Sequence, residues 1–214
     1  MAARGRGRVG YVAPVAILRA LLFVAYPAAV YFALGFASPR AIALFTLALV
    51  AARFAFVAPG RVRAVVRVFA PVALAFGATS AASLLWNHEL GLLLAPALFN
   101  FAMLGVFASS FARPETAIES LARAQVGELP PEEVTYCRRV TGVWCAFFAA
   151  NGAAAAWLAL FGSREAWALY NGAIAYACVG ALFAAEYVYR HWRFRRYVGA
   201  PTDALLRRLF PPRA

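Results

Sequence analysis

The sequence has no lysine and few acidic residues, and both absences narrow the class of protein. All 21 basic residues are arginine, nine residues are acidic, and charged residues make up 14% of the 214 positions. Soluble domains carry about 25% charged residues. Cysteine is also scarce, and its three occurrences follow no spacing typical of a metal site or a disulfide framework: Cys137, Cys145 and Cys178. The sequence therefore argues against an ordinary soluble domain, and it predicts no metal centre and no cofactor.

The chain is instead rich in apolar residues. They make up 64% of the chain, and the mean hydropathy is +0.70. Apolar runs of about 20 residues recur, and a helix of that length crosses a hydrocarbon core of ~30 Å. The runs are continuous rather than alternating, which favours helices over the strands of a closed barrel. The sequence thus predicts an all-α, polytopic membrane helix bundle.

Six apolar runs are candidates for membrane spans. Their approximate bounds are Ala20–Ala37, Ala41–Val57, Val68–Trp86, Leu90–Phe111, Val140–Phe161 and Ala166–Tyr189. Short polar connections at 38–40, 87–89 and 162–165 alternate with longer ones, which predicts three helical hairpins. No stretch between the spans has the composition of a separate domain, so residues 1–214 are expected to form a single membrane domain.

The distribution of arginine predicts how the chain is oriented. With six spans, all but two of the arginines fall on one side of the membrane, and the two exceptions are Arg40 and Arg164. Basic loops stay in the cytoplasm, so both termini are expected there. A basic chain can also bind nucleic acid, but such binding needs a basic face on a soluble domain. We therefore do not expect nucleic acid as a partner.

Two segments outside the spans are expected at the cytoplasmic surface. In the loop 113–137, Ile118, Leu121 and Ala122 share one face of a short surface helix. Pro131 suits the first position of the next helix, so the fifth span is predicted to begin about two turns before the bilayer. The tail 190–214 interleaves arginine with aromatic residues and ends in a short amphipathic helix. This tail suits anionic lipid headgroups or an acidic cytoplasmic partner.

Polar and aromatic side chains within the last two spans are candidates for an interhelical contact or a polar pocket. They are Asn151, Asn171, Tyr170 and Trp144. The two asparagines lie at similar depths on either side of a turn, and an amide buried in lipid needs a partner. Small residues, including Gly152 and Gly180, recur at four-residue spacing on both helices. We predict a tight final hairpin joined by these small residues and by a bond between the two amides. The alternative is a pocket for a lipid headgroup or a solute.

Glu186 is the only carboxylate well inside a predicted span. An intramembrane carboxylate indicates a functional site by default, but a proton relay usually needs a second one at depth, and the spans contain none. Arg190 follows four residues later, in the favourable order for a helical ion pair. We predict a cytoplasmic-side ion cluster that joins Glu186 with one or more of four arginines: Arg190, Arg53, Arg138 and Arg139.

His88 and Glu89 form the only pairing of histidine with an acid near a predicted membrane surface. Adjacent residues on a helix point apart, and no serine or cysteine nucleophile accompanies them. We interpret them as part of a polar turn. The sequence contains no phosphate loop, metal cluster or catalytic motif, so it predicts no catalytic residue and favours an accessory protein over an enzyme.

The last hairpin carries a Trp-x-x-Phe-Phe run followed by glycine, then a turn with tryptophan, then a span that ends Tyr-x-Tyr-Arg. The matching residues are Trp144, Phe147, Phe148, Gly152, Trp167, Tyr187, Tyr189 and Arg190. With them, the stretch from about Leu84 to Arg190 resembles the bacterial intracellular septation protein A family. Asn171 departs from the lysine that this family tends to have, and the basic tail is longer. The resemblance implies a bacterial inner membrane and a role in envelope maintenance through protein contacts.

The segment LPPEEVTYCRRVTGVW is more similar still to bacterial membrane proteins of lipid or aryl-polyene biosynthetic gene clusters. That similarity implies proximity to acyl-chain enzymes. We therefore expect a non-catalytic inner-membrane scaffold or accessory protein, with membrane lipids and other inner-membrane proteins as partners. The alternative is an intramembrane handler of lipids or polyenes, either a transporter or an acyl-transfer helper. A cavity that reaches Asn151, Asn171 or Glu186 would favour this alternative, and a packed interior would favour the scaffold.

Overall fold

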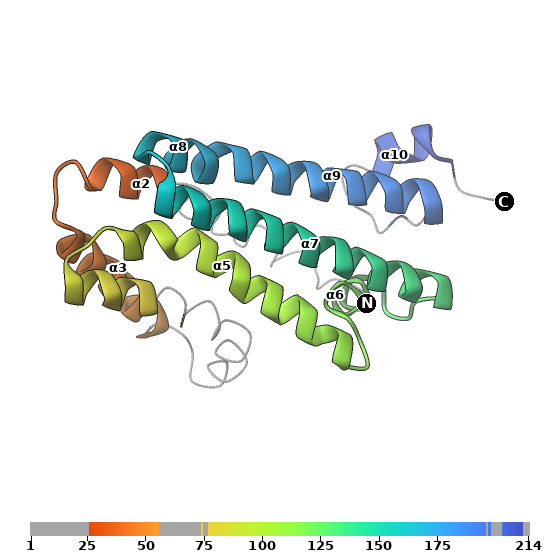
Figure 1. Cartoon of the computed structure of the whole chain (residues 1–214). Coiled ribbons are helices and arrows are strands. Elements are labelled where there is room, and N and C mark those ends of the chain that lie inside the picture. The colour runs from red at the N-terminus through yellow and green to blue at the C-terminus, as the bar shows by residue number, and fades with distance from the viewer. Residues whose placement is uncertain (1–25, 56–73, 75–76, 196, 198–202, 212–214) are drawn as a thin grey trace, which may run out of the picture.

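The computed structural model describes residues 26–55, 74, 77–195, 197 and 203–211, and these residues contain no strand (Figure 1). The α-helices are α2 (Tyr26–Ala33), α3 (Pro39–Ala55), a helix at 77–86, α5 (Leu90–Ser109), α6 (Ala117–Val126), α7 (Pro131–Phe161), α8 (Arg164–Leu169), α9 (Ala175–Phe194) and α10 (Asp203–Leu209). A 3-10 turn, Ser110–Ala112, extends α5, and a π-helical turn, Tyr170–Ile174, joins α8 to α9. The predicted all-α fold is confirmed for the described residues.

Three helices are long and apolar enough to cross a membrane. They are Leu90–Ala112, Pro131–Phe161 and Arg164–Phe194, and they cover the predicted fourth, fifth and sixth spans. The fifth begins at Pro131, which occupies the first turn as the sequence predicts. Of the first three predicted spans, the structure describes the eight residues of α2, the 17 residues of α3 and the helix at 77–86. The chain is thus a helical membrane protein, and the six-span arrangement remains a prediction.

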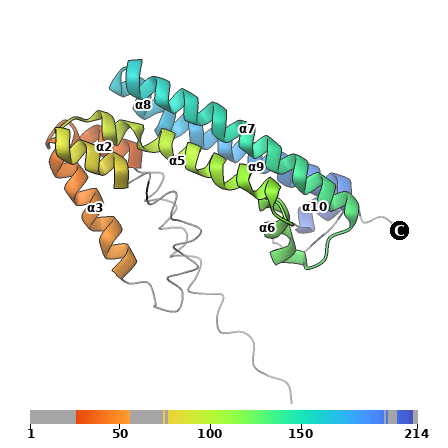
Figure 2. The ribbon, with the colours of Figure 1, turned by 60° about the horizontal axis from the view of Figure 1, so that its bottom comes forward.

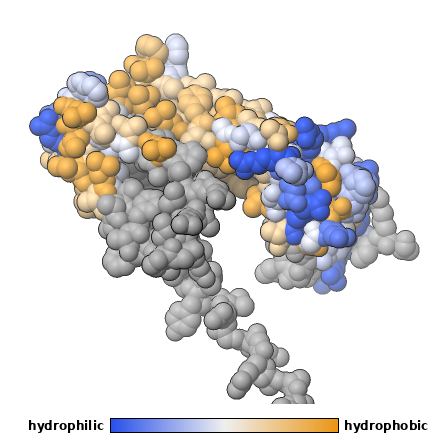
Figure 3. Space-filling model, turned by 90° about the horizontal axis from the view of Figure 1, so that it is seen from below, coloured by the Kyte–Doolittle hydropathy of each residue, from blue (hydrophilic) through white to orange (hydrophobic). Residues whose placement is uncertain are grey.

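The three long helices run alongside one another, each antiparallel to the next along the chain (Figures 1 and 2). At one end of this bundle, α2 packs against α8, and α3 lies nearby. The opposite end holds α6 and α10. Figure 3 shows mainly apolar side chains along the middle of the bundle, with hydrophilic ones gathered towards its ends. This distribution is the one expected when the middle of a bundle lies in hydrocarbon.

Two clusters of buried side chains hold the helices together, one towards each end. The first draws on α2, α3, α5, α7 and α8: Val30, Ile42, Ala43, Leu92, Leu93, Ala159 and Trp167. The second draws on α6 and α7: Ile118, Ala122, Cys137, Val140, Trp144 and Phe148. Partly buried side chains of α5 and α9 pack against the second cluster. The predicted apolar face of α6 therefore contributes to a protein core through Ile118 and Ala122, whereas Leu121, predicted on the same face, is exposed.

The three short polar connections meet at the same end of the bundle. Arg40 donates from its backbone amide to Oδ1 of Asn87 (3.2 Å) and from Nε to the carbonyl oxygen of Leu84 (2.9 Å). Arg164 donates from Nε to a carboxylate oxygen of Glu89 at 3.2 Å. Arg40 and Arg164 are the two arginines predicted to lie on the opposite side of the membrane from all the others. They thus bond the connection 87–89 to the connections 38–40 and 162–165.

The close helix pair is α5 and α7, and the prediction of a tight final hairpin joined by small residues is wrong. Gly152 is buried, and a Cβ added to it would lie 3.0 Å from the Phe101 ring on α5. Gly180 on α9 is exposed and has no atom within 4 Å of such a Cβ. Aromatic rings separate α7 from α9 instead. The centroids of Trp144 and Phe183, for example, lie 4.6 Å apart.

Candidate functional site

A chain of hydrogen bonds joins polar side chains in the middle of the membrane helices. Asn151 on α7 donates from Nδ2 to Oδ1 of Asn100 on α5 (3.0 Å). Its own Oδ1 accepts a bond from the hydroxyl of Tyr170 (2.8 Å). Asn100 in turn donates to the carbonyl oxygen of Pro96, one turn back in α5 (2.8 Å). These hydrogen bonds therefore link α5, α7 and the π-helical turn. They give the buried side-chain amides of Asn100 and Asn151 a partner for both the nitrogen and the oxygen.

Asn171 lies outside this chain of bonds. Its Nδ2 donates to the carbonyl oxygen of Trp167, four residues earlier (2.9 Å). The predicted bond between Asn151 and Asn171 is therefore wrong: in the described part of the chain, neither amide bonds to the other. The physical reason is local. An amide on a helix can reach the carbonyl one turn back, so Asn171 needs no partner on a neighbouring helix.

Trp167 fastens the last two helices to α5. Its side chain is 1% exposed, and Nε1 donates to the carbonyl oxygen of Leu93 at 2.8 Å. Leu93 lies in the first turn of α5, so this bond joins the start of that helix to α8.

Trp144 lies where α5, α7 and α9 meet. Its side chain is buried, and its ring contacts Phe183 on α9 and Phe107 on α5, with centroids 4.6 Å and 6.5 Å away. Two phenylalanines of its own helix, Phe147 and Phe148, pack against it as well. Trp144 is thus an interhelical packing residue, and no described hydrogen bond joins it to the amides.

Only one contact of the predicted ion cluster is present among the described residues. Glu186 accepts a bond from Nε of Arg190 at 2.9 Å, within the same helix. Arg138 instead lies over the ring of Phe111, 5.1 Å from its centroid. Arg139 lines a cavity that Glu186 does not line. The side chain of Arg53 lies outside the described part of the structure. Glu186 is therefore held by the arginine one turn away.

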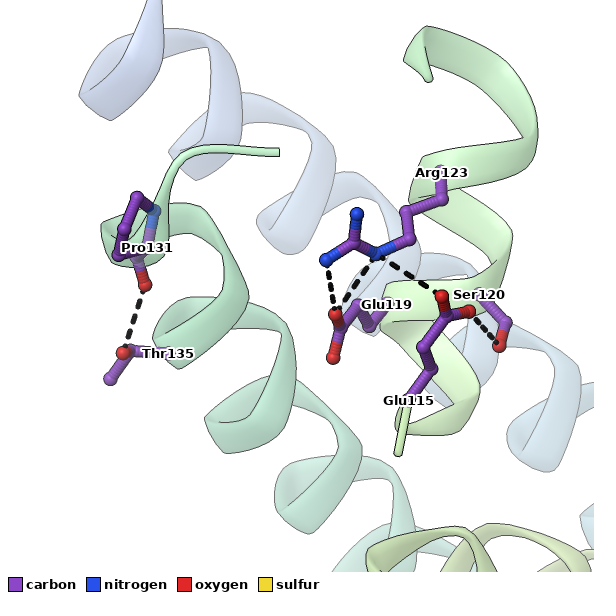
Figure 4. A network of polar contacts seen from close by, with 6 residues as sticks. All are labelled: Glu115, Glu119, Ser120, Arg123, Pro131 and Thr135. Carbon is purple, nitrogen blue, oxygen red and sulfur yellow. Dashed lines mark hydrogen bonds and ion pairs between the residues drawn. The ribbon is translucent and has the colours of Figure 1, made fainter. Parts of the chain in front are cut away.

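The loop helix α6 carries a polar cluster that the sequence analysis missed (Figure 4). The guanidinium of Arg123 lies 2.8 Å from a carboxylate oxygen of Glu119 and 3.5 Å from one of Glu115. Glu119 is only 4% exposed. Its hydrogen bond raises the pKa of the Arg123 guanidinium above its ordinary value, so the charge is fixed. The available signal was the four-residue spacing of the two side chains, which favours an ion pair on a helix.

The start of α6 is held by side chains from other elements. Ser110 accepts a bond from the backbone amide of Ala117 (3.0 Å), and Thr141 on α7 accepts one from the amide of Ile118 (3.4 Å). The first amides of a helix have no partner within it, so these two hydroxyls satisfy donors that would otherwise be unpaired. The helix predicted to lie on the membrane surface is therefore docked on α7.

The basic tail forms α10 and folds back towards the end of α9. Leu206 is buried, whereas Arg207 and Arg208 are exposed. The hydroxyl of Tyr197 donates to the carbonyl oxygen of Leu206 (3.3 Å) and to that of Phe210. The guanidinium of Arg207 lies over the Tyr197 ring, 5.0 Å from its centroid. The amphipathic helix expected from the sequence is thus present, with its apolar side partly used within the protein.

The described residues form a cavity at each end of the bundle. One, of about 280 Å³, is lined by residues of the polar turns, including His88, Glu89 and Arg164. The other, of about 340 Å³, lies between the first turns of α7 and the last turns of α9. Neither is lined by Asn151, Asn171 or Glu186. Among the described residues, no group of histidine, cysteine or acidic side chains is arranged to hold a metal ion.

No protein-family model, curated protein or solved structure matches this chain. The resemblance to the septation protein A family therefore stays a prediction.

Proposed function

We propose that the protein is a non-catalytic scaffold or accessory factor of the bacterial inner membrane. In this proposal it has six spans arranged as three hairpins, with both termini in the cytoplasm. Its task is to hold inner-membrane partners together during envelope maintenance or lipid-linked biosynthesis. The sequence resemblances described above support the choice of these two processes, and the arginine-rich tail supports contact with anionic lipid headgroups.

The observation that carries this proposal is the state of the buried polar groups. Asn151 is bonded to Asn100 and to Tyr170, Asn171 is bonded within its own helix, and Glu186 is paired with Arg190. A protein that moves lipids or polyenes through its interior needs polar groups that are open to the substrate. Neither end cavity reaches these groups. Satisfied polar networks make a helix bundle rigid, which suits a scaffold.

The hairpin arrangement has support of its own. The bonds of Arg40 to Asn87 and of Arg164 to Glu89 bring three short connections to the same end of the bundle. Consecutive hairpins that cross a membrane require such a shared end. In this arrangement Arg40 and Arg164 face the periplasm. Reporter fusions at either terminus should be active only for cytoplasmic reporters, and a periplasmic signal from either end would refute the orientation.

Affinity purification of the full chain in a mild detergent, followed by mass spectrometry of proteins and lipids, tests the function. A scaffold should retain one or more inner-membrane proteins in a fixed ratio to itself. The alternative, a handler of lipids or polyenes, should retain a stoichiometric acyl chain or polyene without any protein in a fixed ratio, so the protein partner, and not a bound lipid, separates the two functions. The second result would reject the scaffold and favour the alternative.

A further inference from the structure

The cavity between α7 and α9 has a composition that points to a ligand. Its α7 wall is a stripe of residues one turn apart along the helix, and its α9 wall is the last turn and a half of that helix. The lining residues are Glu132, Thr135, Tyr136, Arg139, Tyr189, Arg193 and Phe194. Two guanidinium groups thus meet aromatic rings in a space of about 340 Å³, which is within the usual range for small-ligand sites.

The aromatic side chains are packed into a fixed wall. Tyr136 stacks on Tyr189 with ring centroids 5.5 Å apart and an interplanar angle of 15°. Phe194 meets Tyr136 edge-on at 5.2 Å. Since each ring is held by another, this wall needs little rearrangement when a ligand enters. A preformed wall lowers the ordering cost of binding.

The two arginines of the cavity are available to an anion. Arg139 is exposed and makes no ion pair within the described part of the chain. Arg193 has one acidic neighbour, Glu132, at 3.9 Å, and the Glu132 side chain is 64% exposed. Arg190 contacts the Tyr136 ring from nearby, but its guanidinium is already bonded to Glu186. Guanidinium groups form paired, charge-assisted hydrogen bonds with phosphate oxygens.

The depth of the cavity in the membrane favours a lipid phosphate over free phosphate as its ligand. Both Pro131–Phe161 and Arg164–Phe194 are 31 residues long. Helices of that length measure about 46 Å and exceed a ~30 Å hydrocarbon core. With the turn at 162–163 at one membrane surface, the start of α7 and the end of α9 extend past the other surface. The cavity then lies at the level of the lipid phosphates, and Trp192 is exposed on α9 beside it, as in an aromatic belt.

We propose that this cavity binds the phosphate group of an anionic phospholipid, with Arg139 and Arg193 as the phosphate-binding residues and the Tyr136–Tyr189–Phe194 wall against the glycerol backbone. Basic pockets between membrane helices on the cytoplasmic side are known sites for such headgroups. This inference goes beyond the scaffold role, because a scaffold can hold protein partners whether or not this cavity is filled.

Native mass spectrometry of the full chain in detergent, titrated with phosphatidylglycerol, tests the site. The variants Arg139→Gln and Arg193→Gln should each bind about fivefold more weakly, and the double variant about 25-fold more weakly. Glu132→Gln should bind more tightly, since it removes the negative charge beside Arg193. Arg138→Gln is the matched control, because Arg138 lies over Phe111 and does not line the cavity. This variant should bind phosphatidylglycerol with nearly the affinity of the parent.

Two further probes distinguish the source of the phosphate. Phosphatidylcholine should bind more weakly than phosphatidylglycerol, and inorganic phosphate should not displace the bound lipid. Equal losses for Arg138→Gln and Arg139→Gln, or no loss in the double variant, would overturn the site. Displacement by inorganic phosphate would overturn the lipid assignment. Because all the substituted side chains are exposed, circular dichroism should show parental helix content, and the Glu132→Gln gain cannot arise from misfolding.

Discussion

The helix α7 meets its two long neighbours in opposite ways. Towards α5 it presents Gly152, where an added Cβ would lie 3.1 Å from the Cβ of Asn100. Towards α9 it presents rings, and the pair formed by Trp144 and Phe183 keeps the two backbones apart. The first interface brings two backbones together around a bond between two amides. The second is an aromatic layer between two helices that seldom approach closely.

This difference shows which interface holds the bundle together. In lipid, helices gain little from burying apolar surface, so close packing and interhelical hydrogen bonds stabilise their association. The three long helices differ in how much of their most apolar stretch is buried inside the protein. The buried share is 33% in Pro131–Phe161 and 28% in Leu90–Ala112, but only 11% in Arg164–Phe194. We infer that α7 is the central helix of the described structure, and that α9 depends on its attachment to α5 through Trp167 of α8.

The largest expected effect comes from breaking that attachment. Trp167→Ala removes a fully buried ring and the indole donor to the Leu93 carbonyl, so unfolding in detergent should require about 3–5 kcal/mol less free energy. Trp157→Ala, at a side chain that is 64% exposed, provides the control and should change stability little. Chemical denaturation followed by circular dichroism measures both. Similar losses for the two variants would contradict the anchoring role of Trp167.

Replacing glycine with alanine should affect stability differently at closely packed positions and at open ones. A Cβ at Gly91 would lie 2.4 Å from the carbonyl oxygen of Thr79 on the helix at 77–86, whereas a Cβ at Gly180 meets nothing within 4 Å. Gly91→Ala should therefore destabilise the fold by about 2–3 kcal/mol through overpacking. Gly180→Ala should be neutral or stabilising by up to about 1 kcal/mol, because alanine favours helix over glycine. Thermal unfolding of the two variants compares them directly, and a loss at position 180 would place an unexpected close neighbour beside α9.

The ion pair on α9 should contribute least. Glu186 and Arg190 are one turn apart and partly exposed, so their coupling is expected at about 0.5 kcal/mol. Glu186→Gln, Arg190→Gln and the double variant form a cycle that isolates this coupling. A much larger value would indicate that a further charged group shares the pair, as in an ion cluster with more than one arginine. No coupling at all would remove the ion pair from the account of the fold.

Local rules in the sequence predicted local structure well. Pro131, followed by two glutamates, marks the start of α7, because proline suits a first helical turn and acidic residues suit its positive end. The arginine asymmetry also singled out Arg40 and Arg164, which meet at one end of the bundle through Asn87 and Glu89. Both signals depend on residues close in sequence or on a simple count of charges.

The sequence does not predict which helix packs against each helix face. A stripe that contains Gly152 allows a close approach but does not say which helix approaches, and the same spacing on α9 faces no close neighbour. Asn100 lies in an apolar run, APALFNFAM, and nothing around it signals that it pairs with an amide 51 residues later. Asn171 shows the converse, since a carbonyl of its own helix satisfies it and removes the need for a distant partner.

The central claim, that α7 is joined to α5 by a bond between two amides, is tested most directly by a double-mutant cycle on Asn100→Leu and Asn151→Leu. Interhelical bonds of this kind contribute about 0.6 kcal/mol and rarely more than 1.7 kcal/mol in membranes. The two losses should not add, because each variant removes the same contact, and the double variant should be about as unstable as the worse single one. The matched pair, Asn151→Leu with Asn171→Leu, should be additive within about 0.5 kcal/mol. Additive losses for Asn100 and Asn151, with coupling between Asn151 and Asn171, would contradict the account and restore the final hairpin as the amide-bonded pair.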